Sequence, residues 1–140
     1  MTIRYNLPTG WPQNGRPFHH GVVAPAGRTL HITGQVAWDA DANVIGIGDC
    51  ELQARTCFDN VEAILAAVGG RMEDIVSLTI FYVDPADMPA IQKVRAERIA
   101  LAHGPVSILI QAAGLITPDH LVEVVPVAVI PEERFHQPGQ

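Results

Sequence analysis

Residues 105–110 read PVSILI and residues 121–123 read LVE, and together they predict two apolar strands with few polar groups. The polar groups are the hydroxyl of Ser107, the amide of Gln111 and the carboxylate of Glu123. A carboxylate in a strand otherwise made of Leu, Val and Pro either points to water or lies in a site that uses it. These two segments therefore anchor both the expected fold and the expected site.

Turn signals and hydrophobic periodicity divide the rest of the chain into short elements. Helices are expected from Asp49, as N-cap, to a stop at Gly69-Gly70, and again between Pro85 and Gly104. Pro126 lacks a ladder donor, which predicts an edge position or a nearby bulge for the last strand. Strands are expected over 21–24, 29–36, 75–83, 106–113 and 121–130.

The resulting order is β-β-α-β-α-β-β, an α+β domain with two helices on one face of a mixed sheet. The chain of 140 residues has the size of a single domain, with an irregular arm over 1–17 and a tail over 131–140. The sheet face away from the helices is also apolar and the chain supplies no cover for it. Self-association is the simplest solution, and the low charged fraction of 17% supports it.

Charge and hydropathy exclude several classes of partner. A net charge of −6 argues against nucleic-acid binding, which needs a clustered basic surface. Lys93, Arg95 and Arg98 are the only basic residues close together on one expected helix, and we assign this trio to a solvated helix face. No apolar run reaches membrane-spanning length and the first residues do not resemble a signal peptide, so we expect a cytoplasmic protein without membrane partners.

The cysteines and histidines do not suggest a metal or redox centre. Cys50 and Cys57 lie two helical turns apart, on the order of 10 Å, which is too far for a disulfide and predicts reduced thiols. The sequence holds no HxH or HExxH spacing, so no metal site is expected and no cofactor is implied.

Five segments, in order from Arg16 to Ile130, carry short motifs. Four of them are Arg16-Pro17-Phe18, Ile32-Thr33-Gly34-Gln35, Gln53-Ala54-Arg55 with Asp59-Asn60-Val61, and Asp74-Ile75-Val76 with Asp84. The fifth is the pair of apolar strands that holds Ser107 and Glu123. Together the five segments resemble the Rid family (YjgF/YER057c/UK114). The family signature near the carboxyl end runs Pro, small residue, Arg, apolar strand, then a second strand with an apolar-Glu pair, and here Ser107 takes the place of the Arg.

The resemblance implies a chorismate-mutase-like fold and a homotrimer with three clefts between neighbouring subunits. In the archetypes, which hydrolyse imines and enamines, the Arg grips the substrate carboxylate and the Glu positions the attacking water. On that pattern Glu123 is the catalytic residue, and Thr33 and Gly34 help to hold the substrate. Phe18 replaces a Tyr and can still wall a pocket. Ser107 removes a charge-assisted contact with an anionic substrate.

Four further polar residues are candidates for the site, each with an alternative role. His19 and His20 precede the first strand at the expected cleft mouth, where an extended backbone would point them apart, so that at most one enters the site. One of them replaces part of the missing Arg, or both are exposed loop residues. Ser107 lacks a Gly-x-Ser-x-Gly turn, so we expect its hydroxyl to contact substrate rather than to act as a nucleophile. Gln111 alternates to the same face and is a substrate or interface residue.

These observations predict a hydrolytic deaminase for a small imine, enamine or related compound, with water positioned by Glu123 in an intersubunit cleft. The alternative is a non-catalytic trimer that binds a small molecule or acts like a chaperone. The ribonuclease activity attached to this family is disfavoured by the acidic charge of the chain.

Overall fold

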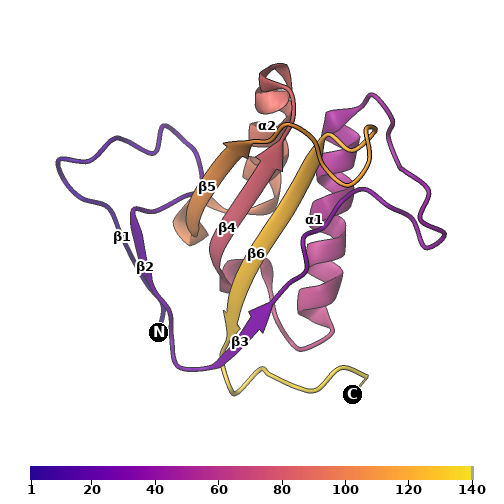
Figure 1. Ribbon diagram of the computed structural model, residues 1–140. Helices are drawn as coiled ribbons and strands as arrows, with labels where there is room; N and C mark the ends of the chain where they lie inside the picture. The colour runs from indigo at the N-terminus through magenta and orange to yellow at the C-terminus, as the bar shows by residue number, and fades with distance from the viewer. Residues whose placement is uncertain (140) are drawn as a thin grey trace.

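The computed structural model describes residues 1–139 and confirms the α+β class with two helices and a mixed sheet. Figure 1 shows both helices on the same side of the main sheet. Short 3-10 turns precede β4, α2 and β5. The elements are β1 (Ile3–Tyr5), β2 (Gly21–Val23), β3 (Arg28–His31), α1 (Cys50–Ala66), β4 (Ile75–Tyr82), α2 (Met88–Arg98), β5 (Val106–Gln111) and β6 (Val122–Ile130).

The main sheet has the strand order β3-β6-β4-β5. Strand β6 runs antiparallel to both of its neighbours, whereas β4 and β5 are parallel because the α2 crossover joins them. Alternate residues of β4 and β6 enter the core against both helices, since side chains along a strand alternate between its faces. Fully buried core residues include Leu78, Ile80, Val122, Val124, Phe58, Val61, Leu65, Ile91 and Val94.

The amino-terminal region differs from the expectation in two ways. The arm over 1–17 is not wholly irregular, because β1 pairs with β2 in a separate two-stranded sheet (Figure 1). The strand expected over 29–36 ends at His31, and the chain forms a further β-bridge with β6 where Gln35 pairs with Val124. Residues 32–34 are therefore not part of the regular β3–β6 pairing. Gly34 lies against the side chain of Glu123 on β6 instead of pairing with that strand.

Pro126 lies in the central strand β6, so the edge position expected for it is wrong. The alternative, a nearby bulge, is confirmed between Ile75 and Ser77 on β4. Pairing with β3 stops at Val127, and the carbonyl of Pro126 accepts a bond from the Ile32 N–H at 3.4 Å beyond that point. The missing N–H of the proline faces the place where the β3 ladder has ended, and a central proline is tolerated there.

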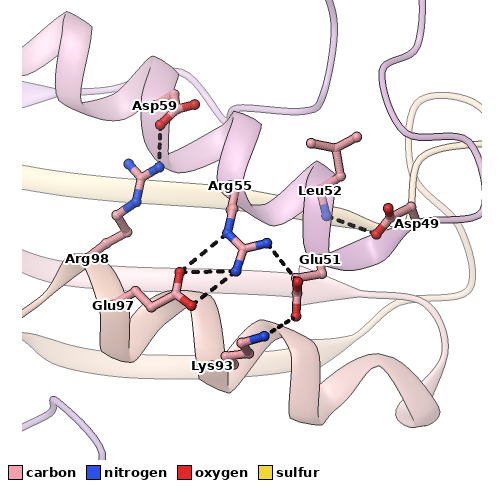
Figure 2. Close-up of polar contacts among 8 residues, drawn as sticks. All are labelled: Asp49, Glu51, Leu52, Arg55, Asp59, Lys93, Glu97 and Arg98. Atoms are coloured by element: carbon pink, nitrogen blue, oxygen red, sulfur yellow. Dashed lines mark hydrogen bonds and ion pairs between the residues drawn. The ribbon is translucent and has the colours of Figure 1, made fainter.

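The ends of α1 follow the sequence signals. The Asp49 carboxylate accepts a bond from the Leu52 N–H at 3.0 Å (Figure 2), and the Gly70 N–H bonds the Leu65 carbonyl at 2.8 Å. Cys50 and Cys57 are buried free thiols. Burial raises the pKa of each thiol to about 12, which keeps both protonated at neutral pH.

The face of the sheet away from the helices remains open in the protomer. Strand β5 is an edge strand, and its Ile108 and Ile110 are 53% and 40% exposed on that open face. Phe81 and Val125 next to them are only half-buried. No helix in residues 1–139 is long and apolar enough to cross a membrane.

Candidate functional site

Glu123 lies on the open face of the sheet, since its neighbours Val122 and Val124 are both buried in the core. Its carboxylate lies against the backbone of Gly34, where a Cβ atom would stand 2.3 Å from Glu123 Oε2. A side chain at position 34 would therefore displace the carboxylate from this position. Thr33, the preceding residue, is exposed. The structure therefore brings Gly34 against Glu123, and the substrate-binding role expected for Thr33 and Gly34 stays a prediction.

Gln53 fixes the segment that leads into this part of β6. Its side chain is fully buried and donates to the carbonyls of Gly46 at 3.0 Å and Asp119 at 2.9 Å. Its carbonyl oxygen accepts a bond from the Leu121 N–H at 2.9 Å. The amide of α1 thus holds the chain two residues before Glu123, which limits the positions that the carboxylate can take.

A second group of predicted residues lines a pocket of about 310 Å³ between β5, α2 and the amino-terminal arm. Phe18 reaches the pocket because its backbone packs directly against the backbone of Gly104. A Cβ atom on residue 104 would stand 2.4 Å from the Phe18 nitrogen. Ser107 points to the helix-covered side of the sheet, since its register partner is the buried Leu78. The lining residues are Trp11, Arg16, Phe18, His19, His20, Gln92, Arg95, Val106, Ser107, Ile108 and Leu109.

Both histidines line this one pocket, so the expectation that at most one of them enters it is wrong. The extended strand starts only at Gly21, and the backbone before it follows no strand alternation. His20 is held on both ring nitrogens, with Nδ1 accepting from the Leu7 N–H at 2.9 Å and Nε2 donating to the Trp11 carbonyl at 3.0 Å. His19 donates from Nδ1 to the Gly104 carbonyl at 2.7 Å, which leaves Nε2 as its acceptor.

Arg95 is the residue in this pocket that the sequence reading assigned wrongly. It was expected on a solvated helix face, yet it is only 1% exposed. Its Nη1 donates to Ser107 Oγ at 2.8 Å, and its Nη2 donates to Gln92 Oε1 at 2.5 Å. A signal was present, because Arg95 follows Ile91 by four residues, the spacing that puts two residues on the same face of a helix.

The two groups do not form a single site within one protomer. In the sheet register Glu123 lies opposite Phe81, and Phe81 lies opposite Ile110, three residues beyond Ser107. Two strand spacings of about 4.8 Å and three residues of about 3.3 Å separate the backbones of Ser107 and Glu123 by roughly 14 Å. Their side chains also point to opposite faces of the sheet. The carboxylate and the pocket are therefore two separate parts.

Comparison with known proteins adds a family to this geometry. Residues 11–130 match the family described as Endoribonuclease L-PSP, also called the YjgF/UK114 family. The chain belongs to this family. Its resemblance to Rid proteins is thereby confirmed, and the chorismate-mutase-like fold with it.

Three solved Rid-family structures are similar over most of the chain. YyfB from Yersinia pestis, a Rid protein of unknown function, is 29% identical with a TM-score of 0.82, covering 92% of this chain and 98% of its own. RidA from an Antarctic Psychrobacter is 22% identical with a TM-score of 0.68, over 91% and 94%. A YjgF/YER057c/UK114 member from Mycobacterium tuberculosis is 19% identical with a TM-score of 0.63, over 93% and 100%. The latter two support the fold alone.

Not every candidate residue of this Rid protein reaches one of the two groups. Gln111 shares a face with Ser107, as expected, but it is exposed and its amide donates to the Val83 carbonyl at 3.3 Å. It does not line the pocket. Within residues 1–139 no group of three or more His, Cys, Asp or Glu side chains gathers as metal ligands would.

Proposed function

We propose that this Rid protein is a hydrolytic deaminase of small imines and enamines, with Glu123 positioning the water in a cleft between subunits of a homotrimer. The observation that carries the proposal is the carboxylate of Glu123, held against Gly34 on a sheet face that the protomer leaves open. It makes no ion pair with any described residue, so it is available to hold a water molecule.

One carboxylate is sufficient for the chemistry. Glu123 orients a water molecule and accepts its proton as the oxygen attacks the C=N carbon, while the nitrogen is protonated. The resulting carbinolamine loses ammonia when the C–N bond breaks, and a carbonyl compound forms as the carboxylate gives up its proton. An enamine enters the same sequence after protonation at carbon gives its imine. The products are one carbonyl compound and one ammonia per water consumed.

The separation of the two groups supports an intersubunit position for the cleft. Glu123 faces the open side of the sheet, whereas the pocket at Ser107 lies at the edge strand β5 on the other side. A second copy that covers the open face with its own β5 edge would bring its pocket toward this carboxylate. The exposed Ile108 and Ile110 are suited to such a contact because burying them removes apolar surface from water.

The replacement of the signature Arg by Ser107 favours a second candidate, a trimer that binds a small molecule and does not turn it over. A polyanionic RNA substrate is disfavoured by the net charge of −6.

Turnover separates the two candidates. Ammonia release from an imine formed in place by an amino-acid oxidase is measured with wild-type protein, with Glu123→Gln and with the exposed Glu133→Gln as a matched control. We expect the first substitution to lower the rate by about 100-fold or more and the control to leave it unchanged. Equal rates for Glu123→Gln and wild type, with the same oligomeric mass, would overturn the proposal.

A further inference from the structure

Arg95 is a buried cation without a counter-ion. A guanidinium has five N–H donors. Two neutral oxygens, on Ser107 and Gln92, accept from its Nη atoms, and Nε has no partner in the described part of the chain. Within the same residues no carboxylate lies at ion-pair distance from Arg95. Such an arrangement is costly for folding, because a buried charge normally requires a partner.

The pocket beside Arg95 is cationic. Arg16 stands at its rim as a second cation, and no Asp or Glu is among its lining residues. Burial, together with the charge of Arg16, lowers the pKa of Arg95 to about 10, which still leaves the guanidinium protonated at neutral pH. The protein therefore concentrates positive charge in one hollow and supplies no negative charge to balance it.

The arrangement also fixes the guanidinium in place. The bonds to Ser107 and Gln92 hold two corners of its plane, so it meets a ligand in a set orientation. The Ser107 hydroxyl on β5 thus accepts a hydrogen bond from Arg95 on α2, and its role is to orient the guanidinium rather than to act as a nucleophile. Trp11 and Phe18 supply apolar walls to the same pocket, as is usual for small-molecule sites.

We propose that Arg95 binds the oxyanion, a carboxylate or a phosphate, of a small ligand in this pocket, with Arg16 adding charge at the rim and Ser107 orienting the guanidinium. An oxyanion is the group that can accept two parallel N–H bonds from a planar guanidinium without a counter-ion. The volume of about 310 Å³ limits the ligand to a small molecule. The proposal concerns the charge of the ligand and does not rest on hydrolysis by Glu123, so the two can fail separately.

Binding is measured on the full chain by the fluorescence of Trp11, which lines the pocket, and in parallel by calorimetry. The probes are pyruvate, inorganic phosphate and the neutral pyruvamide. We expect at least one of the two anions to bind and pyruvamide to bind about tenfold more weakly or not at all. Pyruvate and phosphate distinguish the two kinds of oxyanion.

The matched variants are Arg95→Met and Arg98→Met, which remove two arginines one helical turn apart. We expect the first to weaken anion binding by about tenfold or more and the second to leave it unchanged. Arg95→Lys keeps the charge without the planar fork and should fall between wild type and Arg95→Met. Circular dichroism confirms that each variant is folded. Pyruvamide binding as tightly as pyruvate, Arg95→Met binding like wild type, or no anion binding at all would overturn the proposal.

Discussion

Two arginines of α2, one helical turn apart, lie in opposite environments. Arg98 is on the outer surface of the helix pair, where it bonds Asp59 of α1 and lies 3.4 Å from Glu62. Figure 2 shows the rest of this surface network, in which every charge has a partner. Arg95 lies on the inner side with two neutral partners. The same residue type is paired on the surface and unpaired beside the pocket.

The difference separates stability from function. The exposed pairs of the surface network contribute little to stability because water and salt screen them, and none of their members lines the pocket beside β5. The unpaired groups, Arg95 and Glu123, are the ones that we propose contact the ligand. In this protein the charged groups without an ion-pair partner indicate the functional site better than the paired charges on the surface do.

Mixing two defective variants tests whether the unpaired groups of different subunits meet. On a carboxylate-bearing imine, Arg95→Met is expected to lower ammonia release by about tenfold or more, and Glu123→Gln by about 100-fold or more. If every cleft combines Arg95 of one subunit with Glu123 of its neighbour, co-refolded equal mixtures should regain about a quarter of the wild-type ammonia release, because half of the subunits supply each intact group at random. No recovery in mixed trimers, verified by mass, would place both groups in one subunit.

Gly34→Ala tests the position of the unpaired carboxylate. The new Cβ would stand 2.3 Å from Glu123 Oε2, so the carboxylate must move. We expect kcat to fall about tenfold with the fold retained, since a displacement of about 1 Å in a catalytic group is costly. Gly114→Ala is the control, because its Cβ would meet nothing within 4 Å. Unchanged kcat in Gly34→Ala would show that the contact with Gly34 does not position the base.

The free energies of unfolding of Arg95→Met and Arg98→Met test whether the unpaired arginine is less important for stability than the paired one. Arg95→Met removes an uncompensated buried cation, so its free energy of unfolding should equal or exceed that of wild type. Arg98→Met removes exposed pairs and should lower that free energy by less than about 1 kcal/mol. Urea titration of both proteins measures these values. A loss of several kcal/mol in Arg95→Met would show that the arginine is a structural residue.

His120 gives the smallest expected effect, a dependence of stability on pH. It is buried beside Trp38, and its Nε2 lacks a partner within the described residues. Burial lowers the pKa of His120, although Asp119 and Glu123 oppose the shift. The unfolded chain then binds more protons, so this contribution to stability is present above pH 6.5 and is lost as the pH falls below it.

Thermal unfolding between pH 5 and 8 checks the sign of this effect. The slope of the midpoint against pH should be smaller in His120→Asn than in wild type and unchanged in the control, exposed His31→Asn. A steeper slope in His120→Asn would contradict the account.

Much of the fold could be predicted from local sequence signals. The cap at Asp49, the stop at Gly69-Gly70 and the apolar runs of β4 and β6 depend on neighbours in sequence, and the structure confirms them. The pairing of β1 with β2 and the central position of Pro126 depend on contacts distant in sequence. Periodicity does not determine such contacts.

The site could be predicted only in part. The carboxylate on β6 and its glycine followed from the family resemblance, and the structure places them together. Arg95 was assigned from charge alone, although the spacing from Ile91 indicated a buried position. Strand alternation predicts that Ser107 and Gln111 share a face of the sheet. Only the pairing of Ser107 with the buried Leu78 of β4 shows that this is the face covered by the helices.

The most direct measurement compares ammonia release from two imines, one carrying a carboxylate and made by an amino-acid oxidase, the other lacking it and made by an amine oxidase. We expect the wild-type protein to accelerate release from both imines and to favour the one that carries a carboxylate. Arg95→Met should remove that preference. Acceleration of neither imine by folded protein would contradict hydrolysis, and acceleration of only the carboxylate-free imine would contradict the role of Arg95.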